Sequence, residues 1–200
     1  MCEPATIFRA RSPRCQVIGG QAKANQDVPA QKGNGMSDDA TALLMMFAGE
    51  WQAYQNAVSD ALASLTPEQL ALRAAPDLRS IGELACHIVG SRAGWFNWVL
   101  DAGDNDFKAY EQWHKPAPGS APKTASELVA GLAATWQVMQ RTIASYTLAD
   151  LREEITRERD GHTRVFRRGW VIWHVMEHDL HHGGEISLTL GMHGLPAPDI

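Results

Sequence analysis

The 200-residue sequence lacks any run of 18 apolar residues, and this absence excludes a membrane-spanning helix. No apolar segment follows the arginines near the N-terminus, so we expect no secretory signal peptide. Cysteine is scarce: the sequence holds only Cys2, Cys15 and Cys86. Because their number is odd and their spacings are wide, we expect neither a disulfide framework nor a cysteine-based zinc site. A reducing cytoplasm is the compartment that these absences favour.

An excess of positive charge is also missing, because 23 acidic residues outnumber 18 basic residues and leave a net charge of -5. Surfaces that bind nucleic-acid phosphates usually make a domain basic, so nucleic acid is not an expected partner. Hydrophobic residues make up 44% and charged residues 20%, which is typical of a soluble globular domain. Seven tryptophans are many for this length, and they favour a core that surrounds a pocket.

Residues 1–35 differ from the rest of the chain, because they show no helical or strand period and contain no tryptophan. Such a segment is expected to be disordered, which predicts an N-terminal extension over 1–35 and a domain over 36–200. Ser37 and Asp38 suit the beginning of a helix directly after Met36. A second interpretation is that Met36 is the true start of the protein.

Apolar residues at three- and four-residue steps predict four long helices, over about 38–64, 80–100, 124–146 and 169–190. The second and third begin with the capping boxes Ser80 to Glu83 and Thr124 to Glu127. Four amphipathic helices and few strands predict an all-α protein, a four-helix bundle. The expected core includes these residues: Leu43, Phe47, Trp51, Val58, Met45, Met46, Met139, Met176, Cys86, Trp95, Trp98 and Trp136.

Two connections interrupt the helices. The stretch 101–123 is rich in glycine and proline, which predicts a long irregular loop between the second and third helices, of the kind that forms lids or binding loops. Before the fourth helix, Asp160 and Gly161 form a two-residue turn signal for a small hairpin. Pairing outward from that turn places Ile155 opposite Phe166.

The fourth helix carries the chemistry. At about 100° per residue, one stripe of this helix contains four histidines and an acidic residue: His174, His178, His181, His182 and Glu185. Histidines at i and i+4 can hold one metal ion, and three pairs compete: 174 with 178, 178 with 182, and 178 with 181. The apolar neighbours favour the pair His178 and His182, which lies closest to the predicted interior.

Two histidines are too few for a catalytic metal site, which usually has three protein ligands and an open position. His87 is the best third ligand, because it lies at the edge of the buried face of the second helix. His114 and His162 fall in connections, so no helical period positions them, and His193 follows the end of the last helix. A bland alternative remains, in which His87 is an ordinary packed histidine.

The string from His174 to Ile186, with Gly82 to Val89 and Trp95, resembles the DinB/YfiT-like superfamily of metal-dependent enzymes. The resemblance covers residues 37–200 and implies a four-helix bundle with a metal triad on His87, His178 and His182. Many members have His-Arg-Gly-Gln where this chain has His-Gly-Gly-Glu from position 182. The resulting Glu185 is expected either to act at the site, as a general base or as a partner of a ligand, or to be a solvated surface residue.

What the resemblance implies is a transferase or hydrolase that acts on a small molecule, with a low-molecular-weight thiol as co-substrate and zinc, nickel or iron as the metal. A metal on three neutral histidines would lower the pKa of a bound thiol or water. The second substrate would lie under the loop with Trp113 and His114. Two alternatives stay open, a non-catalytic metal- or ligand-binding stress-response bundle and a helical interaction module without metal. The resemblance to this family also implies a homodimer.

Overall fold

The structure is a computed structural model that describes residues 35–198, with side chains from residue 40. The chain divides into two units, Met1–Lys32 and Gly33–Ile200, and all of the description concerns the second. The predicted disordered extension over 1–35 lies outside the described residues, apart from Gly35, where the first helix begins. None of the described helices is long and apolar enough to cross a membrane.

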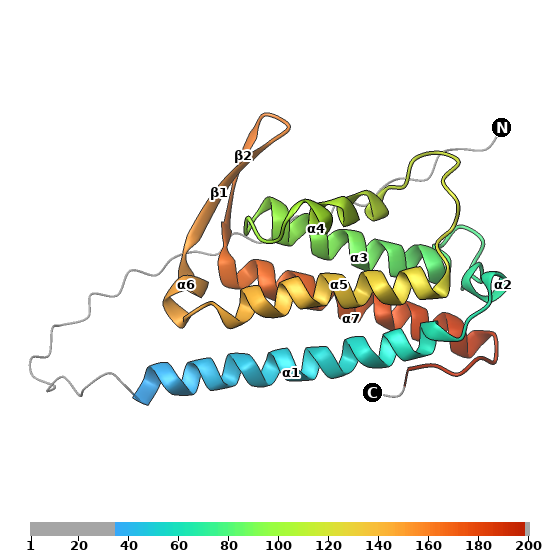
Figure 1. The fold of residues 1–200 in the computed structure, drawn as a ribbon, viewed down its shortest axis with the longest axis horizontal. Helices are drawn as coiled ribbons and strands as arrows, with labels where there is room; N and C mark the ends of the chain where they lie inside the picture. The colour runs from blue at the N-terminus through green and yellow to red at the C-terminus, as the bar shows by residue number, and fades with distance from the viewer. Residues whose placement is uncertain (1–34, 199–200) are drawn as a thin grey trace, which may run out of the picture. The chain divides into compact units, whose positions relative to one another are not determined.

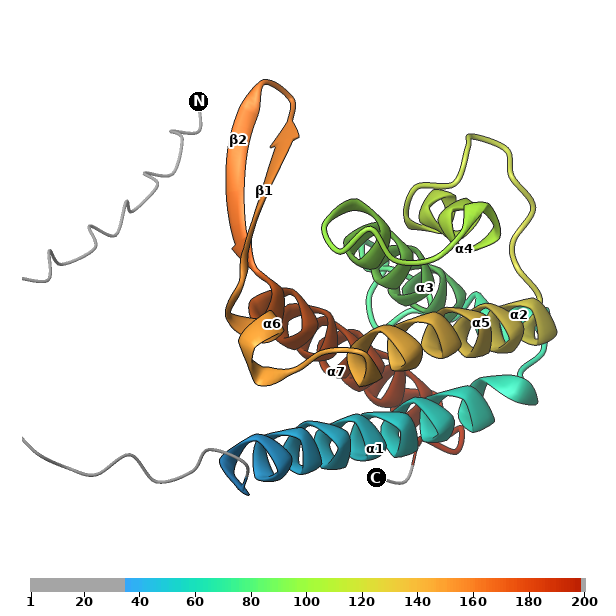
Figure 2. The same cartoon turned by 60° about the vertical axis from the view of Figure 1, so that its left-hand side comes forward.

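The described residues are mostly helical, and four long helices make up their centre: α1 (Gly35–Ala63), α3 (Ile81–Trp98), α5 (Ala125–Ala144) and α7 (Arg168–Met192). Helix α3 packs against α5 and α7, and α1 packs against the same two helices (Figures 1 and 2). Each helix turns an apolar stripe inward. Typical members of the buried core are Val58, Leu62, Ile88, Leu132, Ile186, Trp51, Phe96, Trp136, Met139 and Val175.

The predicted beginnings of the second and third helices are confirmed, whereas the first helix begins at Gly35, before Ser37. The Ser80 hydroxyl accepts from the Glu83 backbone N–H while the Glu83 carboxylate accepts from the Ser80 N–H. Thr124 and Glu127 form the same reciprocal cap on α5. A third box at Thr66 begins the short helix α2 (Pro67–Leu70). Each cap satisfies backbone donors that the first turn of a helix leaves without partners.

The prediction of an irregular loop over 101–123 is wrong for its first half. Two helical segments lie there, α4 (Asn105–Ala109) and the 3-10 helix η1 (Tyr110–His114). Asp104 caps α4 by accepting from the Phe107 N–H at 2.9 Å, and the Phe107 side chain is buried. The stretches 101–104 and 115–124 have no helix, and prolines and Gly119 interrupt the second of them.

The predicted hairpin is present as β1 (Glu154–Arg159) and β2 (His162–Arg167). Ile155 pairs with Phe166 in the expected register. Asp160 and Gly161 take positive φ angles of 53° and 73°, as a two-residue hairpin turn requires. The short helix α6 (Leu148–Arg152) precedes the hairpin and begins with a capping box at Thr147, which the sequence analysis missed.

The N-terminal half of α1 departs from the expected core. Met45 and Met46 are 41% and 53% exposed, and Leu43 and Phe47 are also exposed, so their assignment to the core is wrong. At about 100° per residue, Met45 and Met46 lie well away from the buried stripe that contains Ala48 and Trp51. No described side chain before Ala48 is buried.

The remaining core assignments are partly correct. Met139 and Trp136 are buried, whereas Met176, Cys86, Trp95 and Trp98 are half-buried. Trp95 and Trp98 belong to an aromatic cluster of edge-to-face and stacked rings between α3, the hairpin and α7, which consists of Trp95, Trp98, Phe166, Trp170 and His174.

Candidate metal centre

Helix α7 presents its histidine stripe as the sequence predicts. His182 is buried, His178 is half-buried, and His181 is exposed. Val175 and Ile186, which border the stripe, are fully buried. The side of the stripe that faces the interior is therefore the side of His178 and His182.

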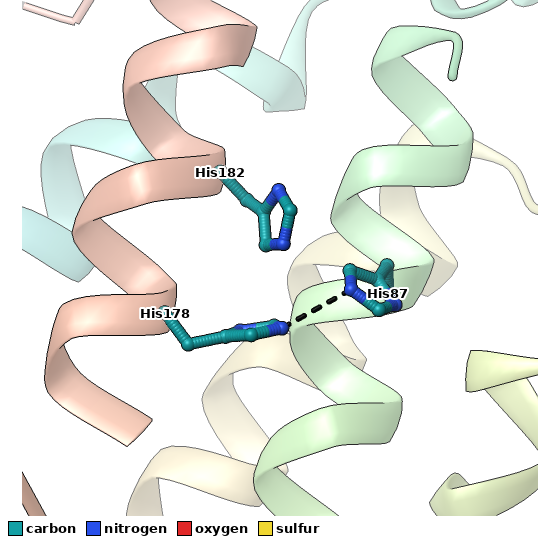
Figure 3. Close-up of side chains that lie close together, drawn as sticks. All are labelled: His87, His178 and His182. Atoms are coloured by element: carbon teal, nitrogen blue, oxygen red, sulfur yellow. Dashed lines mark hydrogen bonds between the residues drawn. The ribbon is translucent and has the colours of Figure 1, made fainter. Parts of the chain in front are cut away.

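His87 comes from the facing helix α3 and is buried between Leu84 and Ile88. The Nε2 atoms of His87 and His178 lie 3.1 Å apart, and Figure 3 shows the two rings pointing toward each other from the two helices. His182 lies one turn further along α7, with its ring turned toward the same space. One ring nitrogen from each of the three histidines lies within 4.8 Å of the others. These three residues are called the triad below.

The triad geometry fits a metal ion. At metal–nitrogen distances of about 2.0–2.1 Å, two tetrahedral ligands have nitrogens about 3.3 Å apart, close to the observed separation of His87 and His178. Imidazole suits zinc, nickel and iron alike, so the donor set agrees with a divalent ion without selecting one. The triad is therefore a cluster that could hold a metal ion.

The protonation of the triad favours metal binding as well. Burial lowers the pKa of His87 to about 3, with a smaller contribution from the charge of Arg79. Burial also lowers the pKa of His178 to about 2, and the neighbouring histidines add to the effect. Both rings are therefore neutral near pH 7, and each has a nitrogen lone pair to donate to a cation.

Glu185 lies beside the triad. Its carboxylate accepts from Nδ1 of His182 at 2.7 Å, and its other oxygen lies 3.6 Å from His181 Nε2. A carboxylate on Nδ1 fixes the tautomer that leaves Nε2 free, as partners of metal-bound histidines commonly do. Within residues 35–198, Nδ1 of His87 and Nδ1 of His178 have no hydrogen-bond partner. His182 is thus the member of the triad whose orientation is fixed by a carboxylate.

Two other histidines of the sequence analysis approach the triad. His181 has its ring centroid 4.8 Å from that of His182, and His114 has its ring centroid 4.5 Å from that of His87. Elsewhere, His174 stacks on Trp170, and His193 contacts the Arg73 carbonyl at 3.0 Å. His114 comes from η1, outside the four long helices. No helical period could have placed it there, since η1 reaches the triad only through packing on α3.

A buried polar network behind the triad also escaped the sequence analysis. Asp179, fully buried, accepts from Arg92 Nε at 2.9 Å and from Trp51 Nε1 at 2.8 Å, and it forms an ion pair with Arg92 Nη2 at 2.8 Å. The network joins α1, α3 and α7, so it fixes the rotation of α7 that points His178 and His182 toward α3. A signal existed: Asp179 falls about 140° from His174 on the helical wheel, among the apolar positions.

Two facing helices of a mostly helical protein bring three histidine nitrogens together. These features place the chain in the class of helical proteins with a candidate metal site. Comparison with known families makes the assignment specific, because the profile of the DinB superfamily matches residues 46–186. The chain belongs to the DinB superfamily.

Among solved structures, the chain is similar to a DinB-like protein from Bacillus cereus ATCC 10987, with 20% identity and a TM-score of 0.60. The match covers 77% of this chain and 95% of that protein, and it supports the fold. A search of curated proteins found no match.

Proposed function

We propose that this protein is a metal-dependent transferase or hydrolase that acts on a small molecule, with a low-molecular-weight thiol as co-substrate. The observation that carries the proposal is the convergence of His87, His178 and His182. A divalent ion held there would lower the pKa of a thiol or water that it binds. Three protein ligands are the number that catalytic sites use when they keep one position open for a substrate.

The side chains around the triad have separable roles in this proposal. Glu185 holds the His182 ring with Nε2 free, which makes it a positioning residue. The Arg92–Asp179 pair fixes α7 against α3 and so sets the distance between His87 and the two histidines of α7. The aromatic cluster begins beside the triad, with its His174 ring 6.4 Å from that of His178, and offers an apolar surface to the organic part of a substrate.

We further propose that the four long helices form the four-helix bundle of the family and that the protein works in the cytoplasm as a homodimer. The helix packing and the likeness to the Bacillus cereus protein support the bundle. The scarcity of cysteine supports a reducing compartment.

Metal analysis of protein expressed without a histidine tag tests the metal site. We expect about one equivalent of divalent metal in the parent and its loss in each single alanine variant of His87, His178 and His182. The variants His174→Ala and His181→Ala are matched controls from the same helix, and both should retain metal. Absence of stoichiometric metal from the parent after reconstitution would remove the proposal.

A thiol-dependent turnover assay against small electrophiles then tests the activity. The parent should consume thiol and electrophile together, and His87→Ala should not. A parent that binds one metal ion and turns over nothing in the presence of thiol or water would be a non-catalytic metal-binding bundle.

A further inference from the structure

The segment η1 lies so close to α3 that only glycine fits beneath it. A Cβ atom added to Gly90 would overlap the backbone nitrogen of His114 and lie 2.8 Å from its Cα. Backbone atoms cannot yield as a flexible side chain can, so an alanine at this position has to displace η1. Gly94, one turn later on α3, has no atom within 4 Å of an added Cβ.

Two further contacts hold η1 in place. The Trp113 ring packs on Gly131 of α5, where an added Cβ would lie 2.8 Å from the ring. The Asn97 side-chain amide of α3 donates to Glu111 at 2.5 Å. Helix η1 is therefore held against both α3 and α5, where it packs on Gly90 and Gly131. This packing is called the seating of η1 below.

The close packing of η1 on Gly90 sets the position of His114. His114 as a residue is exposed, and its ring is tilted by 33° against the ring of His87, which covers part of it. A fourth imidazole thus stands at the solvent side of a triad whose own rings are largely buried. His114 does not belong to the cluster of three nitrogens that lie within 4.8 Å of one another, so it is placed beside the triad and not as one of its members.

Three basic residues contribute positive charge near this imidazole. The pKa of His114 is lowered first by burial and then by the charges of Lys115, Arg79 and Arg159. Lys115 follows His114 directly, Arg79 precedes the cap of α3, and the Arg159 guanidinium lies 4.8 Å above the Trp98 ring. Within residues 35–198 none of these three basic side chains forms an ion pair. Unpaired positive charge from three segments at one site attracts an anion.

We propose that His114, held against His87 by the seating of η1 on Gly90, donates a hydrogen bond to a small anion that binds at the metal of the triad. This inference rests on the proposed function, since it requires a metal ion on the triad. In this inference the ligand binds as an anion on the solvent side of the triad, and η1 recognises it through His114. A ring nitrogen that carries a proton is a donor whether the imidazole is neutral or charged.

The test uses cobalt(II)-loaded full-length protein, with azide as the anionic probe and the visible absorption of cobalt as the readout. We expect His114→Ala to bind one equivalent of cobalt like the parent and to bind azide about tenfold more weakly, the loss that one hydrogen bond to a charged group produces. His162→Ala removes another exposed histidine, in β2, and should leave the azide affinity unchanged.

The seating is tested by a second pair of variants. Gly90→Ala should retain cobalt and lose azide affinity to the same extent as His114→Ala, because η1 is displaced. Gly94→Ala, the matched control on the same helix, should behave like the parent.

Three results would overturn the inference. Unchanged azide affinity in His114→Ala would show that His114 takes no part in anion binding. Loss of cobalt from that variant would show that His114 is a metal ligand. Parent affinity in a folded, cobalt-loaded Gly90→Ala would contradict the role of η1. A parent that binds no cobalt refutes the proposed function instead, so the two failures are distinguishable.

Discussion

Removal of the Asp179 carboxylate should strongly destabilise the fold. In Asp179→Ala, the Arg92 guanidinium remains at a position where its side chain is 2% exposed, and it loses both its hydrogen bond and its ion pair with the carboxylate. Trp51 Nε1 loses its acceptor at the same time. Breaking a buried ion pair from one side costs about 3–5 kcal/mol, because one charge stays buried without its partner.

For a domain of this size, that loss corresponds to a fall in Tm of about 6–20 °C. The measurement is urea unfolding of the metal-free protein in chelator, since Asp179 follows His178 directly and metal would mix two effects. The control is Asp60→Ala, an exposed position on α1, which should change the free energy of unfolding by no more than about 0.5 kcal/mol.

A double variant separates the buried charge from the lost packing. Arg92→Met combined with Asp179→Leu removes both charges, so it should recover most of the stability that Asp179→Ala loses. A loss below about 1 kcal/mol in Asp179→Ala would refute the reasoning. A double variant no more stable than the single one would refute it as well.

Three further predictions concern packing, pH and assembly. Gly183→Ala should destabilise the fold by about 1–3 kcal/mol, because the added Cβ would overlap the Tyr54 hydroxyl. Gly184→Ala, at the next position, meets open space and should stabilise the fold by up to about 1 kcal/mol. Thermal unfolding of the two variants tests both expectations. The free energy of unfolding of metal-free protein should be at its full value above about pH 6.5 and fall as the pH drops from there toward 3. The reason is that the unfolded chain binds protons that His87 and His178, with pKa values of about 3 and about 2, do not bind in the folded state; equal stability at pH 5 and 7.5 would contradict this. Light scattering at micromolar concentration should give twice the chain mass of 21.9 kDa, and a single chain mass would exclude the dimer.

The sequence could predict what depends on local chemistry. Capping boxes act within four residues, so the predicted beginnings of α3 and α5 were correct. One helical turn likewise fixes the spacing of His178 and His182, and the structure brings both beside His87. His87 followed from its place beside Leu84 and Ile88 on a buried helix face.

What depends on distant packing could not be predicted in the same way. The position of His114 requires η1 to lie on Gly90, a contact between separate segments that no periodicity contains. The pairing of Arg92 with Asp179 spans 87 residues. Met45 and Met46 are exposed because they lie on the side of α1 away from the buried stripe that begins at Ala48. Which side of an apolar helix end is buried depends on the neighbours against which the helix packs.

The hairpin is tied to α3 by Arg157, which donates to the carbonyls of Trp98 and Val99 at 2.7 Å each and pairs with Asp101. The last carbonyls of α3 are thus satisfied by a residue almost 60 positions downstream. Insertions and deletions should therefore be tolerated unequally along the hairpin. Residues added at the tip, beyond Asp160, leave this attachment intact, whereas one residue inserted before Arg157 turns its side chain to the opposite face and removes it from α3. Sequence divergence among relatives is accordingly expected to accumulate at the tip and to spare the spacing between Arg157 and α7.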